Sequence, residues 1–236
     1  MNIATESVAA PVVTAVEVND LSLERGGKVL FEKMSWSIPA GSFLAVTGVS
    51  GSGKTSLLAC LRGTLKPSTG QVNLSDDDPF LTGTVFQHLG LTGELSVLTN
   101  VLCGSLGRQP WWKTLFAFNR EQKQRAYEII SSLGLAGLTH KPVRSISGGE
   151  QQRTAIARVL LQDPQIILAD EPTSNLDAAL ADTVMTRLRA LAIERNRTVI
   201  SVLHDRSLVE RFADNELSIG PDYVNGWVLR TISEDA

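Results

Sequence analysis

The sequence has 236 residues, of which 43% are hydrophobic and 20% are charged, and its 22 Lys and Arg against 25 Asp and Glu give a formal net charge of −3. A chain of this length and composition can bury a sizeable core in one large domain, which excludes disorder for most of it. Basic and acidic residues are mixed along the chain rather than gathered in a basic tract, so we expect no nucleic acid among its partners.

The N-terminal segment lacks the basic region and the continuous apolar run of a signal peptide, and no stretch of the sequence is long and apolar enough to span a bilayer. We therefore expect a cytoplasmic protein in which residues 1–15 form a disordered leader. The two cysteines, Cys60 and Cys103, lie in apolar runs without a metal-ligand spacing. This placement favours small buried residues in a reducing compartment.

The first ordered part of the chain alternates between apolar and polar residues. This alternation predicts antiparallel strands between residues 16 and 38, with a turn at Gly26 and Gly27. A short, apolar run over residues 43–47 then predicts a buried strand. We expect the antiparallel strands to lead directly into it.

A complete G-x-x-x-x-G-K-[ST] motif lies between this buried strand and a helical pattern that follows it. Glycines let successive backbone N–H groups turn inward around phosphate oxygens, and the N-terminus of the helix adds a partial positive charge. Lys54 is placed to reach the terminal phosphates of a nucleotide, and the Thr55 hydroxyl to hold Mg²⁺. We call residues 48–55 the phosphate loop. The motif predicts a nucleotide site made of Gly48, Val49, Ser50, Gly51, Ser52, Gly53, Lys54 and Thr55, together with Ser56, the next residue in the chain.

The middle of the chain changes from strand to helix after a short strand predicted at 84–87. Helical spacing over residues 100–106 and 120–135 predicts a helical insertion between strands of the sheet. The segment between these helices contains Trp111 and Trp112. Either these aromatic rings close the core of the insertion, or they form a patch for a partner protein.

Residues 147–150, with the sequence Ser-Gly-Gly-Glu, open the next predicted helix. Ser147 and Glu150 have the S-x-x-E spacing of a capping box, so one interpretation is that the segment is only a helix start. Gly148 and Gly149 favour a second interpretation. A glycine costs about 1 kcal/mol in a helix, and a backbone that approaches a ligand closely has a use for it.

Two acidic residues, Asp170 and Glu171, follow the apolar strand predicted at 165–169. Open α/β sheets bind ligands at the carboxyl ends of their strands, so Asp170 can hold Mg²⁺ there and Glu171 can accept a proton from an attacking water. The next predicted strand, 198–203, ends at His204. We expect this histidine at the same edge of the sheet, as a phosphate contact.

The order of these motifs resembles the ATP-binding subunits of ABC transporters over residues 16–229. The resemblance implies an α/β fold: a P-loop NTPase (RecA-like) core with an antiparallel β subdomain and an inserted α-helical subdomain. It implies one domain over 16–236, with the core at about 16–87 and 156–230 and the helical subdomain at about 88–155. Beside the phosphate loop, the motifs that carry the resemblance are the Q-loop residue Gln87; the signature Ser147, Gly148, Gly149, Glu150 and Gln151; the Walker B strand with Asp170 and Glu171; the D-loop, which ends at Asp177; and the switch histidine, His204.

The resemblance implies that two copies of the chain sandwich two ATP molecules, each bound by the phosphate loop of one copy and by the signature of the other. ATP hydrolysis then depends on positioning and on stabilising charge. The implied catalytic residues are Lys54, Glu171 as the base and His204 beside the γ-phosphate, and the implied Mg²⁺ ligands are Thr55, Gln87 and Asp170.

The same resemblance implies an ATPase on the inner face of the cell membrane. Permease subunits would dock near residues 88–118, and a substrate-binding protein would deliver the cargo. Within the insertion, residues 95–102 and 121–126 are similar to the ATP-binding subunits of phosphonate importers. The leading expectation is import of phosphonate or a related oxyanion. The alternatives are an ABC ATPase that remodels a nucleic-acid or multiprotein complex, and the ATPase of an exporter or a lipoprotein-releasing system.

Two residues depart from the usual pattern of this family. Arg25 stands where an aromatic ring usually packs against adenine, and a guanidinium can also stack on a base. Glu150 stands where the signature usually has glutamine, and it adds a charge near the nucleotide. We therefore include Arg25 among the predicted nucleotide-binding residues.

Overall fold

The structure is a computed structural model, and it describes residues 13–75, 82–85, 89–108 and 118–232. Its strands are β1 (Thr14–Arg25), β2 (Lys28–Pro39), β3 (Phe43–Gly48), β4 (Thr69–Leu74), β5 (Thr82–Val85), β6 (Ile166–Asp170), β7 (Thr198–Val202), β8 (Asn215–Ile219) and β9 (Trp227–Thr231). Its α-helices are α1 (Lys54–Leu61), α2 (Val97–Leu102), α4 (Arg120–Ser132), α5 (Gly148–Gln162), α6 (Ala178–Arg195) and α7 (Arg206–Phe212). Short 3₁₀ helices are η1 (Cys103–Arg108), η2 (Ala136–Leu138) and η3 (Val143–Ser145).

The central sheet has the strand order β5-β6-β7-β3-β8-β9, and all neighbours are parallel except β8 and β9. Strands β6 and β7 are buried along their whole length, which explains their continuous apolar sequences. In the register of the sheet, Val202 pairs with Val46 on one side and with Asp170 on the other. The carboxyl ends of β3, β6 and β7 therefore meet at one edge.

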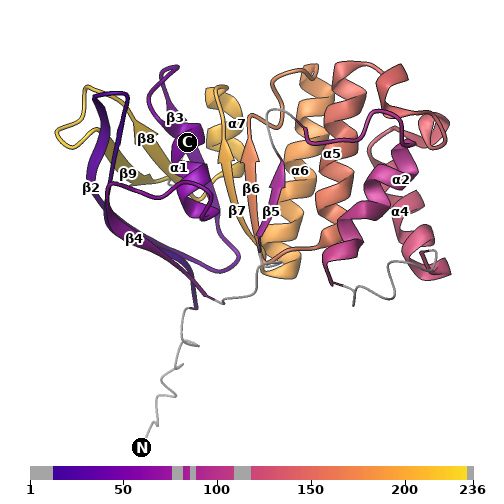
Figure 1. Ribbon diagram of the computed structural model, residues 1–236, viewed down its shortest axis with the longest axis horizontal. Helices are drawn as coiled ribbons and strands as arrows, with labels where there is room; N and C mark the ends of the chain where they lie inside the picture. The colour runs from indigo at the N-terminus through magenta and orange to yellow at the C-terminus, as the bar shows by residue number, and fades with distance from the viewer. Residues whose placement is uncertain (1–12, 76–81, 86–88, 109–117, 233–236) are drawn as a thin grey trace, which may run out of the picture.

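A second, antiparallel sheet with the order β2-β1-β4 covers one face of the central sheet. Its apolar side chains, among them Phe31 and Met34, share a buried cluster with Leu44 on β3, Leu57 on α1 and Ile166 on β6. Figure 1 shows this sheet and α1 at one end of the molecule, the helices α2, α4 and α5 at the other, and β5 to β7 between them. The predicted antiparallel strands are confirmed.

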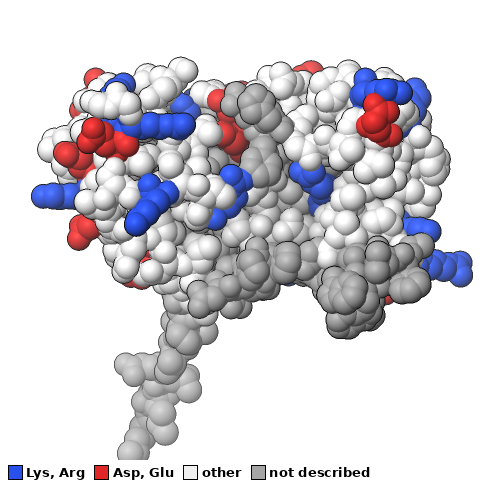
Figure 2. Space-filling view, viewed as in Figure 1, with Lys and Arg blue, Asp and Glu red and all other residues white. Residues whose placement is uncertain are grey.

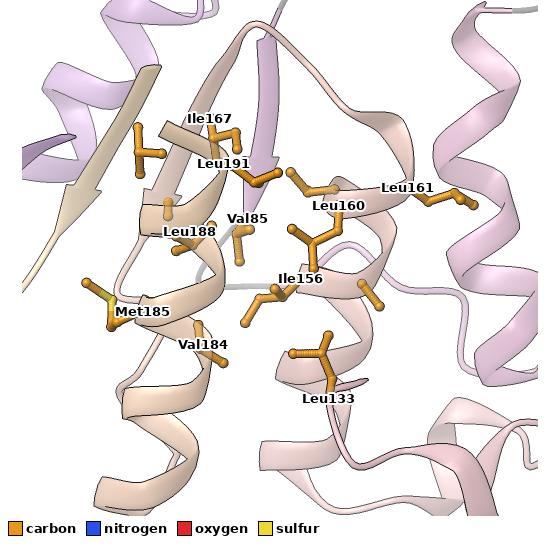
Figure 3. Packing of buried hydrophobic residues seen from close by; sticks show 14 of the residues in the cluster. Val85, Leu133, Ile156, Leu160, Leu161, Ile167, Val184, Met185, Leu188 and Leu191 are labelled. Atoms are coloured by element: carbon orange, nitrogen blue, oxygen red, sulfur yellow. The ribbon is translucent and has the colours of Figure 1, made fainter. Parts of the chain in front are cut away.

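The other face of the central sheet is covered by α5 and α6. Figure 3 shows Ile156 and Leu160 of α5 facing Leu188 of α6, with Val85 and Ile167 of the sheet between and beside them. The same buried cluster continues into the inserted helices through Val97, Val101, Ala126, Ile130 and Leu133. The insertion therefore packs on the sheet through α5 without a separate core.

Several boundaries differ from the sequence expectation. Strand β1 begins at Thr14 and buries Ala15, so these two residues are not part of a leader. Helix α2 begins at Val97 rather than near residue 100, because the Ser96 side chain accepts a hydrogen bond from the Thr99 N–H and caps it. The division expected near residue 155 falls inside helix α5 and stays a prediction.

Within the described part of the chain, no helix is both long enough and apolar enough to cross a membrane. Figure 2 shows acidic and basic side chains interspersed on the face in view, without a continuous patch of one sign on its described part. Trp111, Trp112 and Gln87 lie outside the described residues, so neither interpretation of the two tryptophans is tested.

Candidate functional site

The phosphate loop connects the end of β3 to the start of α1, as its motif predicts. The Lys54 side chain folds back over the loop, and its Nζ donates hydrogen bonds to the carbonyl oxygens of Gly48 at 2.8 Å and Val49 at 2.9 Å. Lys54 is only 7% exposed. Burial lowers the pKa of this amine, while Glu171 and Asp170 nearby raise it. The loop thus holds the ammonium group of Lys54 against its own carbonyl oxygens.

Three glycines give the loop its shape, since Gly48, Gly51 and Gly53 have φ angles of 137°, 76° and 108°. Residues with a side chain rarely adopt these backbone conformations. A Cβ atom on Gly48 would lie 2.0 Å from the carbonyl oxygen of Ile219 in β8, whereas a Cβ on Gly51 would meet nothing within 4 Å. The loop is therefore closely packed at its first glycine and open to a ligand at its middle one.

Gly48→Ala is expected to lower the free energy of unfolding by about 2 kcal/mol or more, because backbone strain and a clash with β8 add together. Gly51→Ala, with strain alone, is expected to cost about 1 kcal/mol. Urea denaturation of both variants tests this difference. Equal destabilisation would show that packing against Ile219 does not matter.

Asp170 and Glu171 stand at the end of β6, at the same edge as the loop. Asp170 is 7% exposed; burial raises the pKa of its carboxyl group, which accepts a hydrogen bond from the Thr55 side chain. Glu171 has a φ of 51°, unusual for a residue other than glycine. Its Oε1 lies 2.8 Å from Nε2 of His204, which follows β7. The sheet register brings these groups together across 33 residues of sequence.

Thr55, Glu171 and His204 line a cavity of about 490 Å³, and Asp170 lies behind Thr55 without being among the lining residues. Its lining combines Glu171 and His204 with residues of the phosphate loop. The hairpin between β1 and β2 contributes Arg25, whose Nη1 donates to Oγ of Ser56 at 3.4 Å, and also Lys28 and Leu30. Sequence motifs did not reveal Lys28 and Leu30. The only signal in the sequence for these two residues is that they lie close to Arg25, just after the Gly26-Gly27 turn. The full lining is Arg25, Lys28, Leu30, Ser50, Gly51, Gly53, Lys54, Thr55, Ser56, Glu171 and His204.

The segment 147–150 is a capping box at the start of α5. The Ser147 Oγ accepts from the Glu150 N–H, and the Glu150 carboxylate accepts from the Ser147 N–H at 2.7 Å. That backbone hydrogen bond is the main reason why the pKa of Glu150 is lowered. Ser147 and Gly148 are exposed, and none of the four residues is among the described residues that line the cavity. The N-terminus of α5 is therefore exposed and does not contribute to the described cavity.

The turn after Glu171 packs against this helix start. A Cβ atom on Gly149 would lie 3.1 Å from the carbonyl oxygen of Asn175, which leaves little room for a side chain. Two residues later, the Asp177 side chain accepts a hydrogen bond from the Leu180 N–H and caps α6. Asp177 thus has a structural role whatever else it does.

The oxygen donors at and beside the cavity fit a magnesium nucleotide. The Thr55 hydroxyl and the Asp170 carboxylate already contact each other beside the buried ammonium group of Lys54. Among the described residues, no group of three or more His, Cys, Asp or Glu could hold a metal by itself. This is compatible with Mg²⁺, which commonly takes one or two protein ligands and completes its shell with phosphate and water.

Comparisons with known proteins agree with this geometry. The family model described as "ABC transporter" matches residues 31–174. The phosphonates import ATP-binding protein PhnC 2 of Nostoc sp. is 39% identical over 80% of this chain and 81% of its own length. The hypophosphite import ATP-binding protein HtxD of Stutzerimonas stutzeri is 36% identical over 85% of this chain and 62% of its own length.

Among solved structures, the dimeric ATP-binding cassette MJ0796 in a post-hydrolysis state, bound to ADP and Pi, superimposes with a TM-score of 0.80. It is 28% identical to this chain, and the superposition covers 92% of this chain and 99% of the other. A structure described as "an inward-facing conformation of a putative metal-chelate type ABC transporter" gives a TM-score of 0.78 at 29% identity, over 93% of this chain and 83% of the other. The predicted P-loop NTPase fold is thereby confirmed.

Proposed function

Because this chain belongs to the ABC transporter family, as an ATP-binding subunit that hydrolyses ATP with Mg²⁺, we propose that it drives import of phosphonate or a related oxyanion through a separate membrane permease. The observation that supports the proposed cargo is the similarity to import proteins for two reduced phosphorus oxyanions, phosphonate and hypophosphite. ATP hydrolysis in the cavity of this chain would supply the energy, and the cargo itself would pass through the permease.

The proposed catalytic roles follow from the cavity. Lys54 and the backbone N–H groups of the loop bind the phosphates, and Thr55 and Asp170 would hold Mg²⁺, which neutralises phosphate charge. Glu171 accepts a proton from the water that attacks the γ-phosphorus, and ADP leaves. His204, at 2.8 Å from the Glu171 carboxylate, orients that base and lies close enough to the cavity to contact the γ-phosphate.

We propose that a second copy of the chain completes each site. The cavity contains the phosphate loop, Glu171 and His204, while Ser147 and Gly148 are exposed at the N-terminus of α5, outside the lining. A helix N-terminus carries partial positive charge and free N–H groups, so it can bind a phosphate presented by a partner. The dimeric cassette bound to ADP and Pi supports this arrangement. Closing and reopening of the dimer would then be the mechanical output.

The proposed contact with the permease lies in the helical insertion near residues 88–118, and the division into core and helical subdomain is proposed with it. In the described part, Asn100 is 2% exposed and its side chain binds backbone atoms of Thr92, Leu95 and Ser96. This network ties the loop before α2 to the helix within the described part of the proposed contact. A substrate-binding protein completes the proposed importer.

Purification of the tagged chain from membranes of its own organism is expected to recover a polytopic membrane protein. Once the complex is reconstituted with its binding protein, a phosphonate should raise the rate of ATP hydrolysis several-fold, because cargo delivery favours closure of the ATP-bound dimer. ATP hydrolysis is measured with phosphonate, hypophosphite, phosphate and sulfate in parallel.

Each other result points to a different function. Recovery of only non-membrane partners would indicate a remodelling ATPase. A permease whose ATPase responds to lipoprotein or to no added oxyanion would indicate an exporter or a release system. Stimulation by sulfate alone would keep the importer and overturn the proposed cargo.

A further inference from the structure

We infer that Gln152 is a positioning residue for Glu171, and that its side-chain amide ties the backbone of this base to helix α5. The inference rests on the proposed role of Glu171. Gln152 lies in the first turns of α5, two residues after Glu150, and it is 3% exposed. Its Nε2 donates a hydrogen bond of 2.9 Å to the carbonyl oxygen of Glu171.

Packing alone does not explain a glutamine at this position. The Gln152 Oε1 atom is buried and has no hydrogen-bond partner among the described residues. A buried polar atom without a partner is unfavourable, and a methionine of similar shape would fill the same space without that penalty. What the glutamine supplies is therefore its Nε2 donor, which bonds to the Glu171 carbonyl oxygen.

The backbone of Glu171 needs such support, because its φ of 51° lies in a region that residues other than glycine rarely occupy. Its carbonyl oxygen accepts hydrogen bonds from the Ser174 N–H at 3.3 Å and the Ser174 Oγ at 3.1 Å, in addition to the shorter one from Gln152. The unusual φ fixes the direction in which the carboxylate leaves the strand, toward His204 and the cavity. Loss of the Gln152 donor should loosen this geometry, while the two Ser174 donors keep the turn folded.

The same hydrogen bond joins two functional segments of the chain. Helix α5 begins at the exposed Ser147-Gly148 end, and Gly149 packs against the turn that follows Glu171. A movement of the helix start is therefore passed to the base through Gln152 as well as through Gly149. In a dimer, contact of one copy's α5 with the other copy's nucleotide would set the position of the first copy's own Glu171.

The test is a double-mutant cycle on the full chain with Gln152→Met, Glu171→Gln and the combination. Gln152→Met is expected to lower kcat for ATP hydrolysis about tenfold to a hundredfold, since small misplacements of a catalytic group have effects of this size. The KM for ATP should stay within about twofold, because the amide does not line the cavity. In the Glu171→Gln background, the added methionine should change the residual rate by less than about twofold, because a residue that acts through the base has nothing left to position.

Gln162→Met is the matched control, since Gln162 lies at the other end of α5 and its Nε2 donates to the Thr82 carbonyl oxygen at 3.3 Å. It should leave kcat within about twofold of the parent. Gln152→Leu, which also lacks the donor and buries no charge, replaces Gln152→Met if the latter does not fold. Thermal unfolding of every variant checks that the protein is intact.

The outcomes separate the inference from the proposed function. An unchanged kcat in a folded Gln152→Met variant overturns the inference, and so does an equal loss in Gln162→Met or an effect confined to KM. An undiminished effect of Gln152→Met in the Glu171→Gln background also overturns it, because the residue would then act elsewhere. Full activity of Glu171→Gln alone overturns the proposed base instead.

Discussion

Glu171→Gln is expected to lower kcat for ATP hydrolysis by about 10²–10⁴-fold while the dissociation constant for ATP changes little. The amide has the shape of the carboxylate and can keep a contact with His204, which lies 2.8 Å from Oε1, but it cannot take a proton from water. Because hydrolysis no longer reopens the dimer, the variant should accumulate as an ATP-bound dimer. Single-turnover kinetics and size-exclusion chromatography with MgATP measure the two effects.

Glu128→Gln is the control for this substitution, since Glu128 is an exposed residue of α4 that accepts a hydrogen bond from Gln124. It should have the parent's rate and the parent's oligomeric state. A Glu171→Gln variant that hydrolyses ATP at the parental rate would remove Glu171 from the mechanism. A slow variant that stays monomeric with MgATP would preserve the base and argue against the shared site.

Lys54→Ala is expected to weaken binding of MgATP by about tenfold to a hundredfold and to abolish most turnover, because hydrogen bonds to charged groups contribute about 1.5–3 kcal/mol each. In the free chain the ammonium group bridges the carbonyl oxygens of Gly48 and Val49. Its removal takes away both the phosphate ligand and the clamp that shapes the loop. Equilibrium binding of a fluorescent ATP analogue and steady-state hydrolysis measure the loss.

Two other lysines provide graded controls for the charge. Lys28 is exposed and lines the cavity from the β1–β2 hairpin, so Lys28→Ala should weaken binding by only a few-fold. Lys66 is exposed and lies outside the described lining, so Lys66→Ala should bind ATP like the parent. Parental affinity in a folded Lys54→Ala variant would contradict the assignment of Lys54 to the phosphates.

Sequence patterns predicted those parts of the site that depend on local spacing. The phosphate loop is one contiguous segment, so its glycines and Lys54 could be identified from their spacing without knowledge of the neighbouring strands. The continuous apolar run before Asp170 likewise predicted a buried parallel strand that ends in acidic residues. For the same reason, the S-x-x-E spacing correctly indicated a capping box at Ser147, although the sequence could not tell whether the box also serves a ligand.

Only the tertiary structure decided which side chains meet. The pairing of β6 with β7 brings Glu171 to His204, and the packing of α5 against the turn after β6 brings Gln152 to the Glu171 backbone. The β1–β2 hairpin adds Lys28 and Leu30 to the cavity wall beside Arg25. No spacing along the chain encodes these contacts, because each depends on the register of a sheet or the seating of a helix, and the whole buried core fixes both. The sequence by itself therefore determined the phosphate loop and the family of motifs around it, and the fold determined how those motifs act on one another.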